Sequence, residues 1–314
     1  MERILITGGT GTVGQAFIDG YKDVYTFAVM SRNETNICEF ERKYRGIRAY
    51  VGDVCNINDV RRVYAAFMPD IVIHAAAMKH INIAEKEPAK AVDNNIIGTM
   101  NVIAVSKQYK VAVTVGISSD KACNTNSVYG MTKKLMEKLF FEAHTQRTKF
   151  VCTRFANVAG SSGSVIPFFL DKVARGEKLP VTDINMNRLM ISKEDAAFLI
   201  YKAISLCRSC ITPLIVCKLS KAVNIGLLAR CISNDIEYVG PREGESLNEI
   251  LIRKDEIPYT FIVGGSIDDI ACIGAAKVSP RFKSSNFMLQ KEYSSETAVY
   301  LSPTQINELI AESI

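Results

Sequence analysis

The chain has 314 residues, a length that predicts one large domain or two coupled ones. Apolar residues make up 48% of the chain and charged residues 23%, the usage of a globular protein with a sizeable core. No stretch reaches the roughly 18 consecutive apolar residues of a membrane span, and no secretory signal precedes the first strand. We therefore expect a cytoplasmic protein with no membrane partner.

The net charge of +5 comes from scattered Lys and Arg residues rather than from basic blocks. This distribution favours anionic small molecules as partners and argues against nucleic acid. Several of the nine cysteines lie among apolar residues, as buried thiols do. Cys207 and Cys210 form a CxxC with no second pair at zinc-ribbon spacing, so we expect no metal site.

Short apolar runs alternate with helical patterns over the first two-thirds of the chain. We expect strands at residues 4–7, 25–30, 47–51, 71–74, 111–117 and 150–154. We expect helices at residues 15–21, 58–67, 89–109 and 129–144. Strands that are apolar throughout and alternate with helices predict a parallel sheet covered on both faces. The expected fold class is α/β, a Rossmann-type doubly wound parallel sheet.

The pattern changes after Gly160. Helices are expected at residues 166–175 and 193–206, and a last strand of the sheet at residues 212–217. We therefore predict a dinucleotide-binding domain over residues 1–165, completed by about 190–220. Residues 166–189 and 221–314 are predicted to form a smaller C-terminal substrate-binding lobe.

A glycine-rich turn follows the first strand and opens the first helix. Gly8, Gly11 and Gly14 have GxxGxxG spacing, which permits a tight turn and a close approach of the backbone to a pyrophosphate. The helix N-terminus offers free N–H groups and a positive dipole to the phosphates. With Thr10, Thr12 and Val13, these glycines are the expected core of a dinucleotide site.

The second strand is followed by Ser31 and Arg32, where an NAD site usually has an acidic residue. A basic residue accommodates a 2′-phosphate, so NADP is the expected cofactor, although Arg32 could also be a solvated surface charge. Asp53 and Val54 follow the third strand and are expected near the adenine, with a turn cap as the alternative for Asp53. Small residues after the fourth strand keep the backbone close to the cofactor; they are Ala75, Ala76 and Ala77.

The expected catalytic residues follow the fifth strand and begin the next helix. Ser119, Asp120 and Lys121 lie at the carboxyl edge of the sheet, where open α/β sheets bind ligands. Tyr129 and Lys133 are four residues apart and share one helix face. A nearby ammonium lowers the pKa of a phenol and makes it a usable base, and Lys133 can also bind the cofactor ribose.

These motifs occur in an order that resembles the extended short-chain dehydrogenases/reductases. More narrowly, the chain resembles the UDP-N-acetylglucosamine 4,6-dehydratases that invert C5. The resemblance covers nearly the whole chain and rests on residues 7–14, 74–80 (HAAAMKH), 94–99 (NNIIGT), 118–122 (SSDKA), 129–133 (YGMTK), 154–167 (RFANVAGSSGSVIP) and 242–249 (REGESLNE). Membrane-anchored dehydratases of this family that retain C5 configuration are expected to have Met at position 129, so Tyr129 favours the inverting group.

The resemblance implies a mechanism for a UDP-sugar substrate. Tyr129 takes the proton of the 4-hydroxyl while C4 gives hydride to NADP⁺, and Ser119 bonds the same oxygen. Lys121 removes the C5 proton, which requires a partly neutral amine. Asp120 protonates the departing 6-hydroxyl, and hydride returns to C6. The product is a 4-keto-6-deoxy sugar of L configuration.

The resemblance also suggests substrate contacts, for which surface solvation is the alternative. The expected substrate-binding residues are Lys79, Asn95, Asn157, Ser164, Arg188, Arg242 and Glu245. Arg suits the pyrophosphate because its planar group donates two bonds. Several positions depart from the family pattern, among them Ser162, Thr125, Asn187 and Ser246, so the resemblance specifies the class of reaction rather than the sugar.

Two other functions stay open at this point. A nucleotide-sugar 4-epimerase would need Tyr129 and Lys133 but neither Asp120 nor Lys121. A non-catalytic NADP-binding module would need none of the four. The helices at 89–109 and from 129 onward pair subunits in this superfamily, so we expect a homo-oligomer, a dimer or larger.

Overall fold

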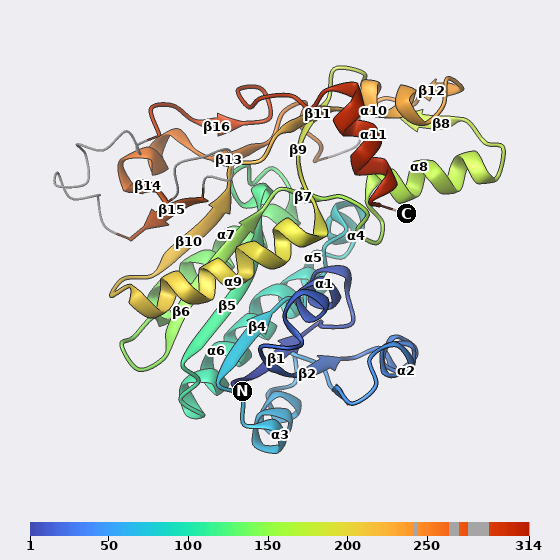
Figure 1. The fold of residues 1–314 in the computed structure, drawn as a ribbon. Coiled ribbons are helices and arrows are strands. Elements are labelled where there is room, and N and C mark those ends of the chain that lie inside the picture. The colour runs from blue at the N-terminus through green and yellow to red at the C-terminus, as the bar shows by residue number, and fades with distance from the viewer. Residues whose placement is uncertain (242–243, 264–269, 276–288, 314) are drawn as a thin grey trace.

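The centre of the molecule is a nine-stranded sheet in the order β14-β15-β10-β6-β5-β4-β1-β2-β3 (Figure 1). The computed structural model describes residues 1–241, 244–263, 270–275 and 289–313. The parallel strands are β1 (Arg3–Thr7), β2 (Thr26–Ser31), β3 (Arg48–Val51), β4 (Ile71–His74), β5 (Val113–Ser119), β6 (Lys149–Phe155) and β10 (Leu214–Lys218). The strand order reverses at β1 and β4, so the expected doubly wound α/β fold is confirmed.

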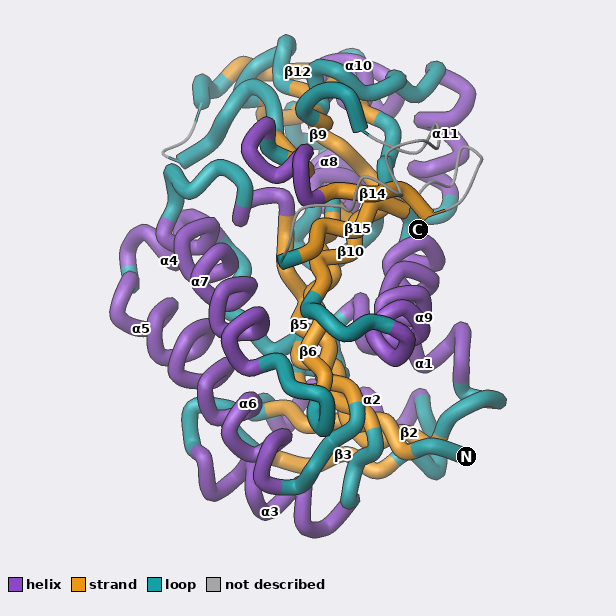
Figure 2. Tube along the Cα trace, turned by 90° about the vertical axis from the view of Figure 1, so that its left-hand side faces the viewer, coloured by secondary structure: helices purple, strands orange, loops and turns teal. Residues whose placement is uncertain are grey.

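Helices cover both faces of this sheet (Figure 2). On one face α1 (Thr12–Tyr21) packs against α9 (Lys193–Ser209). The other face carries α3 (Ile57–Phe67), α6 (Gly98–Gln108) and α7 (Val128–Ala143). Successive residues of β1 therefore enter different cores: Ile4 and Ile6 pack into one and Leu5 into the other. This double coverage explains why the strands are apolar throughout.

In the first half of the chain, two short helices were not expected from the sequence. They are α2 (Glu34–Lys43), capped by the side chain of Asn33, and α4 (Ile81–Lys86). The long helix expected at 89–109 is present but contains a π-helical turn, η1 (Asp93–Ile97), between α5 (Pro88–Val92) and α6. The buried side chain of Asn95, within this turn, bonds the backbone of Met78. Such turns widen a helix locally and often occur at functional sites.

The expectation that residues 212–217 form the last strand of the sheet is wrong. Antiparallel to β10 lies β15 (Ile270–Gly274), and β14 (Thr260–Val263) pairs with β15. The pairing of β15 with β10 joins residues more than 50 positions apart in the chain, which a local pattern does not report. Two strands from the segment 221–314 thus belong to the main sheet.

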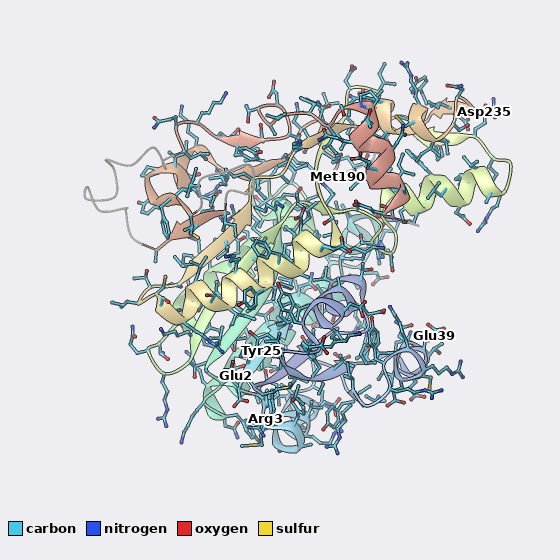
Figure 3. The ribbon with its side chains drawn as sticks, in the orientation of Figure 1. Glu2, Arg3, Tyr25, Glu39, Met190 and Asp235 are labelled. Atoms are coloured by element: carbon cyan, nitrogen blue, oxygen red, sulfur yellow. The ribbon has the colours of Figure 1, made fainter. Side chains whose placement is uncertain are left out.

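Smaller sheets and helices form a second layer above the carboxyl ends of the parallel strands. They are β7 (Asn157–Val158), β8 (Leu179–Val181), β9 (Asn187–Ile191), β11 (Ala222–Asn224), β12 (Ile236–Tyr238), β13 (Ile250–Ile252), β16 (Tyr293–Ser294), α8 (Val165–Ala174), α10 (Ile225–Ile232) and α11 (Pro303–Ala311). Most of these elements contribute to a separate apolar core that includes Ile166, Leu179 and Met190, whereas Leu251 and Ile252 of β13 pack into the core of the main sheet. In Figure 3, Met190 lies inside the molecule, whereas the exposed Glu39 and Asp235 lie at its edge.

Candidate active site

A cavity of about 1080 Å³ separates the parallel sheet from this upper layer. It begins at the glycine turn after β1, passes the ends of β4 and β5, and ends against α8, β9 and the segment before β13. Single-ligand pockets are commonly about 300–1,000 Å³, so this cavity has room for two ligands in sequence.

The turn between β1 and α1 has the geometry of an anion cradle. Gly8 has φ of +70°, and a Cβ there would lie 2.8 Å from the backbone of Ala76. The Gly11 N–H donates to Gly8 O at 3.0 Å, and no described side chain caps the N-terminus of α1. The first turn of α1 carries no acidic residue, so its N–H groups and dipole are compatible with phosphates. The residues expected at this site, Gly8 and Thr10–Gly14, all line the cavity.

The remaining residues expected near the cofactor line the same part of the cavity; they are Ser31, Arg32, Asp53, Val54, Ala75, Ala76 and Ala77. Arg32 is exposed, and the Ser31 hydroxyl accepts from Thr10 Oγ1 at 3.3 Å. The Asp53 carboxylate accepts from the backbone N–H of Cys55 at 2.9 Å, so Asp53 also caps a turn.

The three residues after β5 form a connected polar group. Ser119 ends β5, and Asp120 and Lys121 form the short helix η2 (Asp120–Ala122). The Ser119 hydroxyl donates to Asp120 Oδ1 at 2.7 Å, and Lys121 Nζ lies 3.1 Å from Asp120 Oδ2. Asp120 is buried, while Lys121 and Ser119 keep partial exposure to the cavity.

A second carboxylate contacts this group from a distant part of the chain, the segment before β13. Glu249 Oε1 lies 2.5 Å from Lys121 Nζ and 3.1 Å from Arg188 Nε. Glu249 Oε2 accepts from Asn157 Nδ2 at 2.7 Å. The sequence reasoning did not include Glu249 among the site residues, although it ends the motif at 242–249 on which the resemblance rests. Only the tertiary structure brings it to Lys121.

The protonation states of this cluster depend on one another. Burial, and then the Glu249 carboxylate, raise the pKa of Asp120 to about 7. Burial disfavours the charged form of Glu249, but Lys121 and Arg188 outweigh it and lower the pKa of Glu249 to about 2. Burial also opposes the Lys121 ammonium, yet Asp120 and Glu249 outweigh it and raise the pKa of Lys121.

The pKa shifts of Lys121 and Asp120 correct one expectation and agree with another. The sequence predicts a partly neutral Lys121, but in the structure two carboxyl groups stabilise its ammonium form. The role expected of Asp120 requires a carboxylic acid, and a pKa near neutrality is compatible with that role.

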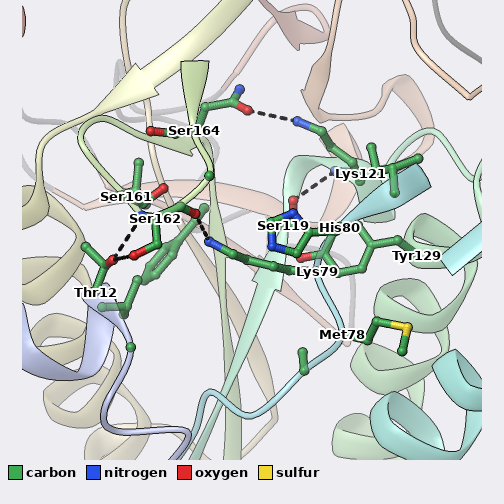
Figure 4. Close-up of a pocket in the computed structure, with 18 of the residues that line it drawn as sticks. Thr12, Met78, Lys79, His80, Ser119, Lys121, Tyr129, Ser161, Ser162 and Ser164 are labelled. Carbon is green, nitrogen blue, oxygen red and sulfur yellow. Dashed lines mark hydrogen bonds between the residues drawn. The ribbon is translucent and has the colours of Figure 1, made fainter. Parts of the chain in front are cut away.

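Tyr129 and Lys133 lie on one face of α7 and line the cavity. Figure 4 shows Tyr129 beside Ser119. Lys133 Nζ donates to Ile117 O at 2.7 Å and lies 5.9 Å from the centre of the Tyr129 ring. Burial lowers the pKa of Lys133 to about 8. The expected lowering of the Tyr129 pKa is wrong for this structure, because burial and the Asp120 charge raise it.

The residues expected to contact substrate have different surroundings. Lys79, Asn157, Ser164, Arg188 and Glu245 line the cavity. Figure 4 shows Lys79 donating to Ser162 O, at 2.6 Å, across the cavity. Asn157 Oδ1 accepts from Lys121 Nζ at 3.1 Å. Ser164, which precedes α8, has a buried hydroxyl without a hydrogen-bond partner among the described residues.

Two of the expected substrate contacts have other partners in the structure, and a third lies outside the described residues. Asn95 does not line the cavity, because its side chain holds the backbone of Met78 and the hydroxyl of Thr132. Arg188 donates to Ser246 O and pairs with Glu249, so a pyrophosphate role would require it to leave these partners. Arg242 lies outside the described residues.

Over the part of the chain that the structure describes, no group of His, Cys, Asp and Glu has the arrangement of a metal site. No described helix is long and apolar enough to cross a membrane.

Comparison with known proteins gives consistent results. The chain is 35% identical over 274 residues to a UDP-N-acetylglucosamine 4,6-dehydratase (inverting) of Campylobacter jejuni, covering 83% of this chain and 80% of the relative. It is 32% identical to a UDP-glucose 4-epimerase of Rickettsia canadensis, covering 82% and 79%. The crystal structure of Pen from Bacillus thuringiensis matches with a TM-score of 0.89 and 29% identity, covering 99% and 97%. Residues 4–263 match the family model described as polysaccharide biosynthesis protein, and the chain belongs to that family.

Proposed function

We propose that this chain is a UDP-N-acetylglucosamine 4,6-dehydratase that inverts C5. The observation that carries the proposal is the Asp120–Lys121 pair, which lies between Tyr129 and the upper layer in a single large cavity. A dehydratase needs an acid and a base in addition to the groups that oxidise C4, and this pair supplies both chemistries. The inverting dehydratase from Campylobacter jejuni, similar over most of both chains, supports the same assignment.

Oxidation at C4 is assigned to the groups at the start of α7 and the end of β5. Tyr129 accepts the proton of the 4-hydroxyl, and Ser119 hydrogen-bonds the same oxygen. When bound, a nicotinamide dinucleotide accepts hydride from C4, later returns it to C6, and brings a positive charge that favours the phenolate of Tyr129. Lys133, whose pKa is lowered to about 8, stays largely protonated at neutral pH and favours the phenolate as well.

Elimination of water is assigned to the Asp120–Lys121 pair. The 4-ketone acidifies the C5–H, and Lys121 as a neutral amine removes that proton. Asp120 as a carboxylic acid gives its proton to the 6-hydroxyl, which leaves as water. C5 then gains a proton on the opposite face, which balances the proton that Tyr129 took from the 4-hydroxyl, and the product has the L configuration.

The cofactor is proposed to be NADP. The glycine turn fits a dinucleotide pyrophosphate, because a Cβ at Gly8 would collide with Ala76 and the α1 N-terminus is free of acidic side chains. Arg32, exposed at the end of β2, supports a 2′-phosphate over the bare ribose hydroxyl of NAD.

Substitution of Arg32 tests this choice directly. In Arg32→Glu we expect the ratio of NAD to NADP affinity to rise about 10- to 100-fold, since a charge-assisted bond contributes about 1.5–3 kcal/mol. Fluorescence titration of both cofactors measures the ratio. The matched control is Arg42→Glu on the exposed face of α2, and an equal change in both variants would contradict the role of Arg32.

The UDP-sugar is proposed to lie between the catalytic group and α8. The unpartnered Ser164 hydroxyl and the N-terminus of α8 are suited to its pyrophosphate, with Lys79 as a further cation. Glu245 is proposed for the uridine ribose, Asn157 for the sugar region and Arg242 for the pyrophosphate. A cytoplasmic location and a homo-oligomer of two or more subunits are proposed with these assignments.

A nucleotide-sugar 4-epimerase is the second candidate. It is favoured by the similarity to the Rickettsia canadensis epimerase, at 32% identity. That activity needs only Tyr129, Lys133 and the dinucleotide, so it leaves Asp120 and Lys121 without a chemical role.

NMR of UDP-N-acetylglucosamine incubated with the protein in deuterated water separates the two candidates. A dehydratase produces a new C6 methyl signal, with deuterium at C5 and ring couplings of the inverted sugar. There is no net change in NADPH absorbance, because the hydride returns internally. Formation of the C4 epimer alone would replace our proposal by the epimerase, and conversion of UDP-glucose alone would keep the reaction and change the sugar.

A further inference from the structure

Glu249 reaches the catalytic group from the segment just before β13. Its two carboxylate oxygens contact the Lys121 ammonium, the Arg188 guanidinium and the Asn157 amide. Its backbone N–H donates to Ser295 Oγ at 2.9 Å, so both the side chain and the main chain are held. A carboxylate with this many partners is fixed in place rather than free to rotate.

The Lys121 ammonium consequently has a carboxyl group on each of two sides. Asp120 Oδ2 lies at 3.1 Å and Glu249 Oε1 at 2.5 Å, and Asn157 Oδ1 accepts at 3.1 Å. Only Glu249 is also paired with an arginine, Arg188 at 3.1 Å. The two carboxyl groups are therefore unequal: Glu249 is stabilised as a carboxylate, and Asp120 is the one able to accept a proton.

We propose that Glu249 is a positioning residue that holds Lys121 against Asp120, so that one proton passes from the Lys121 ammonium to Asp120 and prepares base and acid together. The inference rests on the proposed dehydration, because it assigns to Glu249 the preparation of that step. In the transfer an N–H bond of Lys121 breaks and an O–H bond forms at Asp120 Oδ2. The products are a neutral amine and a carboxylic acid, and the total charge is unchanged.

This transfer resolves the conflict between the resting state and the chemistry. At rest Lys121 is protonated, although a base at C5 must be neutral. After the transfer Lys121 can take the C5 proton and Asp120 can give its proton to the 6-hydroxyl. Elimination thus returns the pair to a lysine ammonium and an aspartate, which is the state from which it began. No outside proton source is needed for this step.

The proton inventory also predicts a pH dependence. The charged or titratable groups facing this pair are Glu249 and Arg188 from the upper layer and Tyr129 from α7. Below about pH 7 Asp120 is already protonated while Lys121 is still an ammonium ion. Lys121 then cannot pass its proton to Asp120, so no neutral amine is available as the base. The rate of elimination should therefore fall as pH falls through this range. In Glu249→Gln the pH at which the elimination rate falls should be lower, because a negative charge next to Asp120 is removed.

The first test follows Asp120 itself and needs no substrate. Protein labelled with ¹³C at the aspartate carboxyl carbons is titrated by NMR, and the Asp120 signal is identified by its absence in Asp120→Asn. We expect it to titrate near neutrality in the unmodified protein and about one pH unit or more lower in Glu249→Gln. An unchanged midpoint would overturn the proposal, whether or not the protein turns over UDP-N-acetylglucosamine.

The second test separates positioning from folding. Glu249→Gln should lower kcat for C6 methyl formation about 10- to 100-fold, while C4 oxidation, seen as reduced cofactor, persists. Glu249→Asp, which restores the charge, should recover part of the rate. The matched control is Glu256→Gln, which removes a carboxylate held by Arg154 rather than by Lys121. Glu256→Gln should lower the stability of the protein and leave unchanged the pH at which the elimination rate falls. If that pH shifts equally in both variants, the role of Glu249 is merely structural.

The two failures are distinguishable. If the unmodified protein leaves UDP-N-acetylglucosamine unconverted, the proposed function fails, and the carboxyl titration still decides whether Glu249 controls the proton on Asp120.

Discussion

The chemistry assigned to Lys121 depends on which of its neighbours holds a proton. Burial alone would favour the neutral amine, but two carboxyl groups at 3.1 and 2.5 Å favour the ammonium. Burial, and then the Glu249 carboxylate, raise the pKa of Asp120 to about 7 against the opposing effect of Lys121, and at this pKa a carboxyl group can act as an acid. The protonation states of Lys121 and Asp120 therefore depend on each other and on Glu249, and single substitutions should separate oxidation of C4 from elimination of water.

Replacement of Lys121 should stop the reaction after its first step. In Lys121→Ala, removal of the base should lower the rate of dehydration by about 10²- to 10⁴-fold. Oxidation of C4 is assigned to Tyr129, Lys133 and Ser119 rather than to Lys121, so reduced cofactor should accumulate and be detectable at 340 nm. Lys138→Ala, an exposed lysine on α7, is the control and should behave as the unmodified protein. Full dehydration by Lys121→Ala would refute the role assigned to this residue.

The turn between β1 and α1 sets the approach of a dinucleotide to the sheet. The positive φ of Gly8 and its contact with the Ala76 backbone leave no space for a side chain. Because the free N–H groups of α1 follow this turn directly, a distorted turn would misplace the phosphates.

Gly8→Ala should weaken NADP binding. A residue with a Cβ at φ of +70° costs about 1–2 kcal/mol, and the 2.8 Å contact adds to this. We expect at least a tenfold higher Kd by isothermal titration calorimetry. Gly20→Ala is the control within the same helix: its Cβ would meet nothing within 4 Å, and it should stabilise α1 slightly. Equal affinity in the two variants would contradict a dinucleotide at this turn.

A buried ion cluster attaches the segment around β13 to the main sheet. Arg154, on β6 and fully buried, pairs with Glu137 of α7 and with Glu256 of η3 (Lys254–Tyr259). Its guanidinium also donates to Leu251 O within β13, at 2.8 Å. These contacts hold β13 against the main sheet, whereas the Glu249 carboxylate, just before β13, is held by its own partners Lys121, Arg188 and Asn157.

Loss of the Glu256 charge should destabilise the fold more than loss of a charge at an exposed residue. Burial disfavours the charged form of Glu256, but Arg154 outweighs it and lowers the pKa to about 2. Because the folded pKa lies below the unfolded value near 4.5, this stabilisation is present above pH 4.5 and is lost as pH falls towards 2. Glu256→Gln should reduce the free energy of unfolding at pH 7 by about 3 kcal/mol, measured with urea. The difference between the two proteins should shrink in acid; a constant difference would exclude the charge as its cause.

At the scale of the whole molecule, an apolar surface is exposed outside the three buried apolar cores. The exposed side chains lie on the α5–η1–α6 segment and on α7, which pack against each other; they are Val92, Ile97, Met100, Met131 and Leu135, each 41–50% exposed. Neighbouring exposed apolar groups often mark an interface between subunits. They agree with the helices proposed to pair subunits.

Charge on this surface should dissociate the proposed oligomer. We expect Met131→Glu combined with Leu135→Glu to sediment as a monomer of 34.7 kDa, while the unmodified chain sediments as a dimer or larger. Ile211→Glu, at a residue 76% exposed elsewhere on the molecule, should not change the mass. A monomeric unmodified chain at micromolar concentration would refute the proposal.

The sequence alone was sufficient for features that depend on short-range geometry. The parallel strands, most of their helices and the glycine turn follow from local periodicity and from the backbone freedom that a tight turn needs. The helical spacing of Tyr129 and Lys133 places both on one face whatever surrounds them. For this reason the expected dinucleotide and catalytic residues after β1, β5 and at the start of α7 lie in one cavity.

Only the tertiary structure decided what depends on groups distant in the chain. The pairing of β15 with β10, the role of Asn95 in holding Met78 and the place of Glu249 all join segments that no local pattern relates. The protonation of Lys121 was decided in the same way, because a pKa reports burial and every nearby charge at once. Local sequence patterns thus identified the candidate catalytic residues, whereas long-range packing determines the protonation states of Lys121 and Asp120.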